Sequence, residues 1–164
     1  MARVRPDQPL APSLLDRLID QEPGVSREPP RGRHQVLREL KESVRRDLEN
    51  LLNTRWRAVS PPPDLKELEV SLANYGIPDC TASNLGLARY RTELCRIIER
   101  VIRNYEPRFQ SVRVRMRDNA EPRDRTLRFQ IDALLHAVPA PEPVVFDSTL
   151  EPTTGTVEVK GLGA

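Results

Sequence analysis

The chain has 164 residues, of which 26 are basic and 24 are acidic, so its formal net charge is only +2 at pH 7. This length predicts one domain with enough residues to build a hydrophobic core. The nearly balanced charge argues against a strong overall field that would draw the chain to nucleic acid or to a membrane surface. No apolar run approaches the roughly 20 residues that cross a bilayer, and the N-terminal residues lack the apolar stretch of a secretory signal. We therefore expect a cytoplasmic protein.

Residues 1–33 form an arm that is rich in proline and charged residues and buries too little apolar surface to fold alone. Within this arm we expect a short amphipathic helix near residues 13–20, with Ser13 as its cap. The apolar residues of that helix are Leu14, Leu15, Leu18 and Ile19. Because so short a helix is marginal in water, it should dock on its own domain or on a neighbouring subunit. Residues 34–160 are expected to form a single folded domain, followed by a flexible tail at 161–164.

Two longer segments have the three- and four-residue apolar spacing of amphipathic helices. The first begins near His34 and ends at Asn53. Its apolar stripe consists of Leu37, Leu40, Val44, Leu48, Leu51 and Leu52. The second helix ends at Glu106. Its stripe consists of Leu87, Tyr90, Leu94, Ile97, Ile98, Val101, Ile102 and Tyr105.

The segment between these helices contains prolines and turn residues. Trp56 is expected to anchor the core. Asp64 is placed to cap a short helix whose apolar residues are Leu65, Leu68 and Leu72. Gly76 and Pro78 predict a turn.

From Phe109 onward the apolar period changes to two residues, which indicates strands. The expected strands lie at about 109–117, 127–132, 144–149 and 156–160. Short polar loops between neighbouring strands favour antiparallel pairing. Helices first and strands afterwards predict an α+β fold, in which N-terminal helices pack on one face of a small antiparallel sheet. The opposite face would carry Arg113, Arg115, Arg117, Arg128, Gln130 and Asp132.

The most informative stretch is Glu106-Pro107-Arg108, which lies where the second helix changes to the first strand. Pro107 disfavours the helical conformation at Glu106, so the helix should end there. Residues two apart in an extended segment point the same way, so Glu106 and Arg108 should project together. One interpretation is a helix stop in which Arg108 satisfies the last carbonyls and Glu106 pairs locally. The other is a site that binds a partner protein, with Arg108 as a surface residue that lacks a buried partner.

No catalytic or metal-binding pattern is apparent in the sequence. The 2 histidines lack metal-ligand spacing, and Cys80 and Cys95 lack the second pair that a zinc site or a disulfide framework would need. A glycosidase needs a protonated carboxylic acid beside a sugar-binding cleft. A neighbouring guanidinium such as Arg108 favours the ionised form of Glu106 instead. We therefore expect no enzyme, no cofactor and no metal.

Glu106-Pro107-Arg108 resembles the Glu-Pro-Arg motif of the phage baseplate wedge proteins labelled "lysozyme-like" and of their type VI secretion relatives, the TssE proteins. Five segments of the chain are similar to TssE proteins in the same order. They are residues 13–18 (SLLDRL), 43–55 (SVRRDLENLLNTR), 74–79 (NYGIPD), 102–108 (IRNYEPR), and 146–147 (FD) with 154–155 (TG). The resemblance implies a structural subunit of a contractile injection machine, located in the baseplate beneath the sheath. It also associates Glu106-Pro107-Arg108 with baseplate assembly. Residues 23–33 match no motif of this family.

We interpret the chain as a non-catalytic component of a type VI baseplate that contacts other wedge subunits and the base of the contractile sheath. This would be a hetero-oligomeric assembly without nucleic acid and without direct membrane insertion. The expected partner-binding residues are Glu106, Pro107, Arg108, Arg113 and Arg115. Arginine suits such contacts because its planar fork forms bidentate, partly desolvated hydrogen bonds.

The sequence leaves two alternative functions open. The first is nucleic-acid binding through the arginine-lined sheet face, which would contact phosphates. Sheets that bind single strands usually also display aromatic rings, whereas the exposed positions here are Arg, Gln and Asp. The second, less favoured alternative is a peptidoglycan hydrolase.

Overall fold

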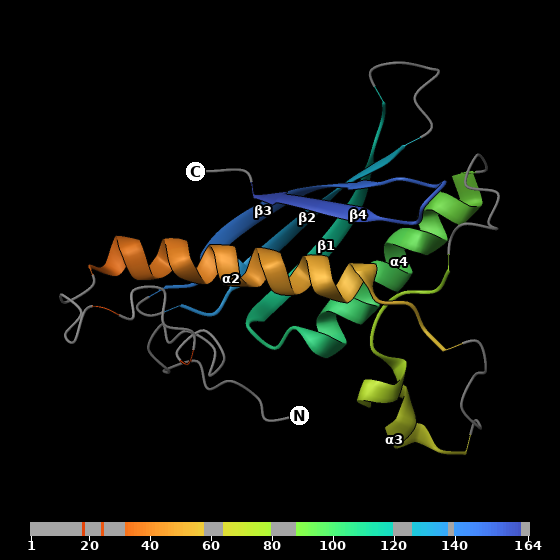
Figure 1. Cartoon of the computed structure of the whole chain (residues 1–164), viewed down its shortest axis with the longest axis horizontal. Coiled ribbons are helices and arrows are strands. Elements are labelled where there is room, and N and C mark those ends of the chain that lie inside the picture. Colours follow the sequence, from red (N-terminus) through yellow and green to blue (C-terminus); the bar gives the residue numbers. More distant parts are fainter. Residues whose placement is uncertain are drawn as a thin grey trace.

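The computed structural model describes residues 18, 24, 32–57, 64–79, 88–119, 126–137 and 140–161. The helices are α2 (Arg33–Asn53), α3 (Lys66–Glu69), the 3-10 helix η1 (Leu72–Asn74) and α4 (Ala88–Tyr105). The strands are β1 (Phe109–Arg117), β2 (Leu127–Leu135), β3 (Glu142–Leu150) and β4 (Val157–Gly161). Helices therefore precede a four-stranded antiparallel sheet, which confirms the predicted α+β fold (Figure 1).

The sheet is a meander in the order β1-β2-β3-β4, so each strand pairs with its neighbour in sequence. The register places Ile131 of β2 between Val114 of β1 and Phe146 of β3. All three side chains are buried, which identifies the core face of the sheet. β2 extends to Leu135, beyond the predicted end at residue 132, because the apolar alternation continues through Ala133 and Leu135.

The core lies between this sheet face and the two long helices. α2 crosses the face and packs along β4, while α4 packs along β1 (Figure 1). The buried residues of the helices are Leu40, Val44, Leu48, Leu51, Leu52, Leu94, Ile98, Val101 and Ile102. These belong to the predicted stripes. Tyr90 was predicted to be buried, but its side chain is 41% exposed near the start of α4.

The prediction that Trp56 anchors the core is wrong, since this residue is 37% exposed. Its main-chain N–H donates to the carbonyl of Ile77 at 2.9 Å, and the N–H of Ile77 donates to Thr54 at 2.9 Å. Ile77 is 1% exposed and fills the core at this position. The indole Nε1–H of Trp56 donates to the carbonyl of Gly76.

Gly76 makes the close approach of these two segments possible. Its φ is 109°, a conformation that side chains other than glycine rarely adopt, and a Cβ there would lie 2.3 Å from the Thr54 carbonyl oxygen. The structure thus has a bend at Gly76, where the sequence predicts a turn, and Ile77 directly after it forms a bridge with Arg55. The short helix α3 also exists, but the residue before it is Leu65 and no side chain caps it. Its expected apolar face is not buried, because Leu65 is 48% exposed and Leu72 is 79% exposed.

Several predictions lie outside the described residues. They concern Ser13, Leu14, Leu15 and Ile19 of the expected N-terminal helix, together with Cys80, Leu87 and residues 162–164. Leu18 is described; it is helical and 81% exposed. Within the described ranges, no helix combines the length and the apolar character that a membrane span requires.

Candidate functional site

Glu106-Pro107-Arg108 forms the whole connection between α4 and β1. The N–H of Glu106 donates to the carbonyl of Ile102 at 2.8 Å, which is the last helical hydrogen bond. The carbonyl of Arg108 accepts from the N–H of His136 at 2.8 Å, so the end of β2 holds the junction in place. The predicted helix stop before Pro107 is confirmed.

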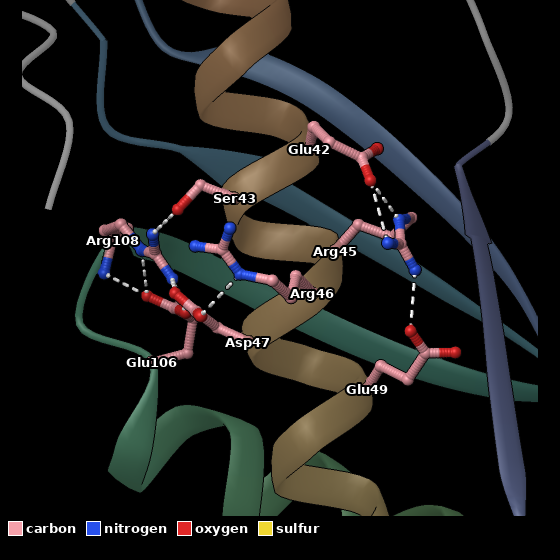
Figure 2. A network of polar contacts seen from close by, with 8 residues as sticks. All are labelled: Glu42, Ser43, Arg45, Arg46, Asp47, Glu49, Glu106 and Arg108. Carbon is pink, nitrogen blue, oxygen red and sulfur yellow. Dashed lines mark hydrogen bonds and ion pairs between the residues drawn. The ribbon is translucent and has the colours of Figure 1, made fainter. Parts of the chain in front are cut away.

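Glu106 and Arg108 lie on the same side of the junction, as their two-residue spacing predicts. The Nε of Arg108 lies 2.7 Å from Oε1 of Glu106, and the main-chain N–H of Arg108 donates to the same oxygen at 3.1 Å. A guanidinium NH2 group also contacts Oε2 of Glu106 (Figure 2). Glu106 is only 5% exposed. A single guanidinium therefore satisfies both oxygens of a buried carboxylate.

The same guanidinium also binds α2. It donates to Oγ of Ser43 at 3.1 Å and to Oδ2 of Asp47 at 2.6 Å (Figure 2). Ser43 and Asp47 are four residues apart, so they share one side of α2. The expectation that Arg108 lacks a buried partner is wrong, because Glu106 and Ser43 are both buried. Arg108 is instead a clamp between α2 and the α4–β1 junction.

Ser43 and Asp47 were not predicted as site residues, although both lie in a segment that resembles the family. Each directly precedes a fully buried residue of the apolar stripe, Val44 or Leu48, so each lies at the border of the buried face. Polar residues at this border, four apart on a helix, are the available sequence signal. This sequence signal does not predict which residue binds Asp47, because Arg108 lies 61 residues away in sequence.

The electrostatics of this clamp keep the arginine charged. Burial alone lowers the pKa of Arg108, but hydrogen bonds and charge from Glu106 and Asp47 outweigh burial, and the pKa is raised. Arg46 adds a weaker ion pair, with its Nε 3.9 Å from Oδ1 of Asp47. The cluster thus balances two carboxylates with two guanidinium groups.

Two tyrosines border the clamp. The rings of Tyr75 and Tyr105 meet edge to face, with centroids 5.2 Å apart and planes inclined by 72°. The hydroxyl of Tyr105 donates to the carbonyl of Ser71 at 2.8 Å. Burial raises the pKa of Tyr75, and the negative charges of Asp47 and Glu106 raise it further. Three of the segments that resemble the family, 43–55, 74–79 and 102–108, therefore meet at one place.

The structure does not bring Arg113 and Arg115 into this cluster. They are exposed and point to the face of the sheet away from α2 and α4. Arg115 forms an ion pair with Asp132 at 3.1 Å. Pro107 is exposed at the junction itself.

The cluster has the composition of a structural clamp. Both of its carboxylates, Glu106 and Asp47, form ion pairs with the guanidinium of Arg108. Among the residues that the structure describes, no group of three or more His, Cys, Asp or Glu side chains is arranged to hold a metal ion. The arrangement neutralises buried charge and joins helix to sheet.

Comparison with the sequence profiles of known families identifies the family of this chain. The sequence profile of the family described as Baseplate wedge protein gp25 matches residues 38–140, which run from α2 to beyond β2 and include every residue of the clamp. The chain belongs to this family. The resemblance seen in the sequence is thereby confirmed.

A solved structure, "The baseplate complex from the type VI secretion system", contains a chain that is 21% identical to this one. The similarity covers 70% of this chain and 96% of that chain, with a TM-score of 0.49. No curated protein matches the chain.

Proposed function

We propose that this member of the gp25 family is a non-catalytic structural subunit of a type VI secretion baseplate. It acts in the cytoplasm, within a hetero-oligomer, and contacts other wedge subunits and the base of the contractile sheath. The family match over residues 38–140 carries this proposal. The five segments that resemble TssE proteins support the assignment to type VI systems rather than to phage tails.

The clamp supports a contact role for the junction. Glu106 and Arg108 are fixed by α2, so the exposed Pro107 sits on a turn with little freedom to lose when a partner binds. A preorganised surface of this kind binds with less entropic cost than a mobile loop. In this proposal Pro107 contacts the partner, Arg108 contributes the part of its side chain that is still exposed, and the buried Glu106 fixes the position of Arg108.

Arg113 and Arg115 form a second proposed contact region on the solvent face of the sheet. Both side chains are exposed, and arginine is enriched among residues that dominate interface energies. Ion pairs on this face join Arg115 to Asp132 and Arg117 to Asp147. These acidic neighbours weaken the positive field that nucleic-acid binding would need, so this face favours a protein partner.

Co-purification tests the proposal. The tagged full-length chain is isolated from its native cytoplasm, and bound proteins are identified by mass spectrometry. Baseplate and sheath subunits should be enriched. Recovery of nucleic acid, with binding to mixed-sequence DNA that weakens steeply as salt rises, would instead support the alternative function.

The proposed contact residues are tested with exposed-site variants that should keep the fold. Pro107→Ala and the double variant Arg113→Ala/Arg115→Ala should each lose baseplate partners without a large change in melting temperature. Arg96→Ala is the matched control, because its side chain is 70% exposed on α4. Equal recovery of partners by all the variants would remove these residues from the interface.

A further inference from the structure

The two faces of the sheet differ in what covers them. The long helices α2 and α4 both pack on the core face (Figure 1). On the opposite face no described element covers β1 and β2, whose alternate side chains stay exposed or half-buried. These side chains form the arginine face: Ser111, Arg113, Arg115 and Arg117 of β1, and Arg128, Gln130, Asp132 and Leu134 of β2.

The polar residues in the middle of the arginine face contact one another. Arg115 forms an ion pair with Oδ2 of Asp132 at 3.1 Å. The amide of Gln130 donates from Nε2 to Oδ1 of Asp132 and accepts from Nε of Arg117 at 2.8 Å. Arg117 also lies 4.0 Å from Oδ1 of Asp147, on the neighbouring strand β3. Both oxygens of Asp132 are therefore already in contact with neighbours within the sheet.

Arg113 is left without an acidic partner. The register places it directly opposite Asp132, but that carboxylate pairs with Arg115 instead. Within the described residues, Arg113 forms no ion pair. At the other end of this face Arg117 lies directly opposite Arg128, and like charges at opposed positions repel. The described strands β1, β2 and β3 place four arginines and two carboxylates on this side of the sheet, so an excess of positive charge remains.

The arginine face adjoins an apolar patch at one end. Leu134 and Val145 point to the same side as Asp132, because one follows it by two residues and the other is its cross-strand neighbour. Leu134 lies opposite the exposed Pro143, and both Leu134 and Val145 are half-buried. Arg113 therefore lies at the border between apolar side chains and the other arginines.

A helix suits such a surface better than an extended segment does. A single strand on a sheet face leaves its N–H and C=O groups without partners, whereas a helix bonds its own. Residues two apart on a strand are separated by about 6.6 Å, and residues four apart on a helix by about 6.0 Å along its axis. A helix that lies along β1 with a carboxylate at every fourth position therefore brings one carboxylate near each of Arg113, Arg115 and Arg117.

We propose that the arginine face binds an acidic amphipathic helix of a partner protein. The carboxylates of this helix lie along β1 against Arg113 and Arg115, and its apolar side chains contact Leu134 and Val145. Arg113 contributes most, because it can bind a carboxylate without breaking an ion pair within the sheet. Complementary charge attracts the helix and selects it over basic segments. This inference rests on the proposed function, since it names the chemistry of the partner at its second contact region.

Photo-crosslinking in the native cytoplasm identifies the segment that contacts this face. A benzophenone amino acid replaces Ser111, which is exposed two residues before Arg113, in the tagged full-length chain. Crosslinked peptides are mapped by mass spectrometry and should come from a helix with Asp or Glu at every fourth position. Crosslinks to a basic or uncharged segment, crosslinks to nucleic acid, or no crosslink at all would overturn the proposal.

Charge exchange with the purified partner tests the contact itself. Arg113→Glu/Arg115→Glu should weaken binding at least about tenfold, and changing two carboxylates of the crosslinked helix to arginine should restore most of the affinity. The matched control, Arg96→Glu/Arg100→Glu, makes the same change of net charge at exposed positions of α4 and should bind like the parent. If circular dichroism shows that the double variant is unfolded, Arg113→Gln is measured instead and should weaken binding about two- to fivefold. A folded variant that binds like the parent would overturn the proposal.

The same experiments distinguish this inference from the proposed function. Recovery of baseplate subunits without a crosslink from position 111 to an acidic helix would overturn the inference alone. A crosslink to an acidic helix of a protein outside the baseplate, without recovery of baseplate subunits, would support the partner chemistry and overturn the proposed function.

Discussion

Replacing Arg108 with alanine removes the guanidinium that satisfies the carboxylate of Glu106 and the side chains of Ser43 and Asp47. Breaking a fully buried ion pair by deleting one partner costs about 3–5 kcal/mol. Asp47 is 36% exposed, so its part of the network contributes little, and the cost comes mainly from Glu106, which is 5% exposed. We expect Arg108→Ala to lower the free energy of unfolding by about 2–4 kcal/mol, because water reaches Glu106 through the space that the arginine leaves.

Urea denaturation followed by circular dichroism measures this loss, and the melting temperature should fall by about 5–15 °C. Arg113→Ala, an exposed arginine on the adjoining strand, is the control and should stay within about 0.5 kcal/mol of the parent. Arg108→Lys should recover only part of the loss, because an ammonium group lacks the planar fork that reaches Glu106, Ser43 and Asp47 together.

A double-mutant comparison tests the cause. Adding Glu106→Gln to Arg108→Ala removes the unpaired buried charge, so the double variant should be more stable than Arg108→Ala alone. An Arg108→Ala protein with parental stability would refute the clamp. Baseplate assembly is then compared well below the melting temperature of each variant. A loss of assembly that exceeds the loss of folded protein would support direct contact between Arg108 and a partner.

Three further predictions concern the neighbourhood of the core. Gly76→Ala should cost about 3 kcal/mol or more in unfolding free energy, because its φ is 109° and the new Cβ would collide with the Thr54 carbonyl; an unchanged urea midpoint would contradict this. Ser148 is 2% exposed, and its hydroxyl has no hydrogen-bond partner among the described residues. Ser148→Ala should therefore leave the free energy of unfolding unchanged or raise it by up to about 1 kcal/mol, whereas a clear fall in melting temperature would show that the hydroxyl has a partner. Burial raises the pKa of both Tyr75 and Tyr105 above 10.0, so the folded state holds these phenolic protons more tightly than the unfolded state does. The contribution of these protons to the free energy of unfolding is fully present below pH 10.0 and is lost as the pH rises through the raised pKa values. Urea curves across this range should show a shallower fall for Tyr75→Phe, and an equally steep fall would exclude this tyrosine as a cause.

Local periodicity was sufficient to predict much of this fold. The buried stripe of α2 and the alternation along β1 follow from repeats within one element, and the end of α4 before Pro107 follows from that proline. Pro107 also determined that Glu106 and Arg108 project together, because its effect on the backbone reaches only the adjoining residue. Such features depend on residues a few positions apart, so the sequence itself carries them.

The tertiary structure decided where the polar groups of these elements find their partners. Arg108 binds Asp47, 61 residues away, only because the sheet brings the α4–β1 junction beneath α2. Trp56 is exposed for the same reason: Ile77, from a separate segment, takes the core position beside it. Periodicity predicts which side chains of a helix or strand face the core, but it does not predict which residues of other elements contact them. Contacts between residues far apart in sequence depend on how the folded chain brings distant segments together, and a local repeat carries no information about this.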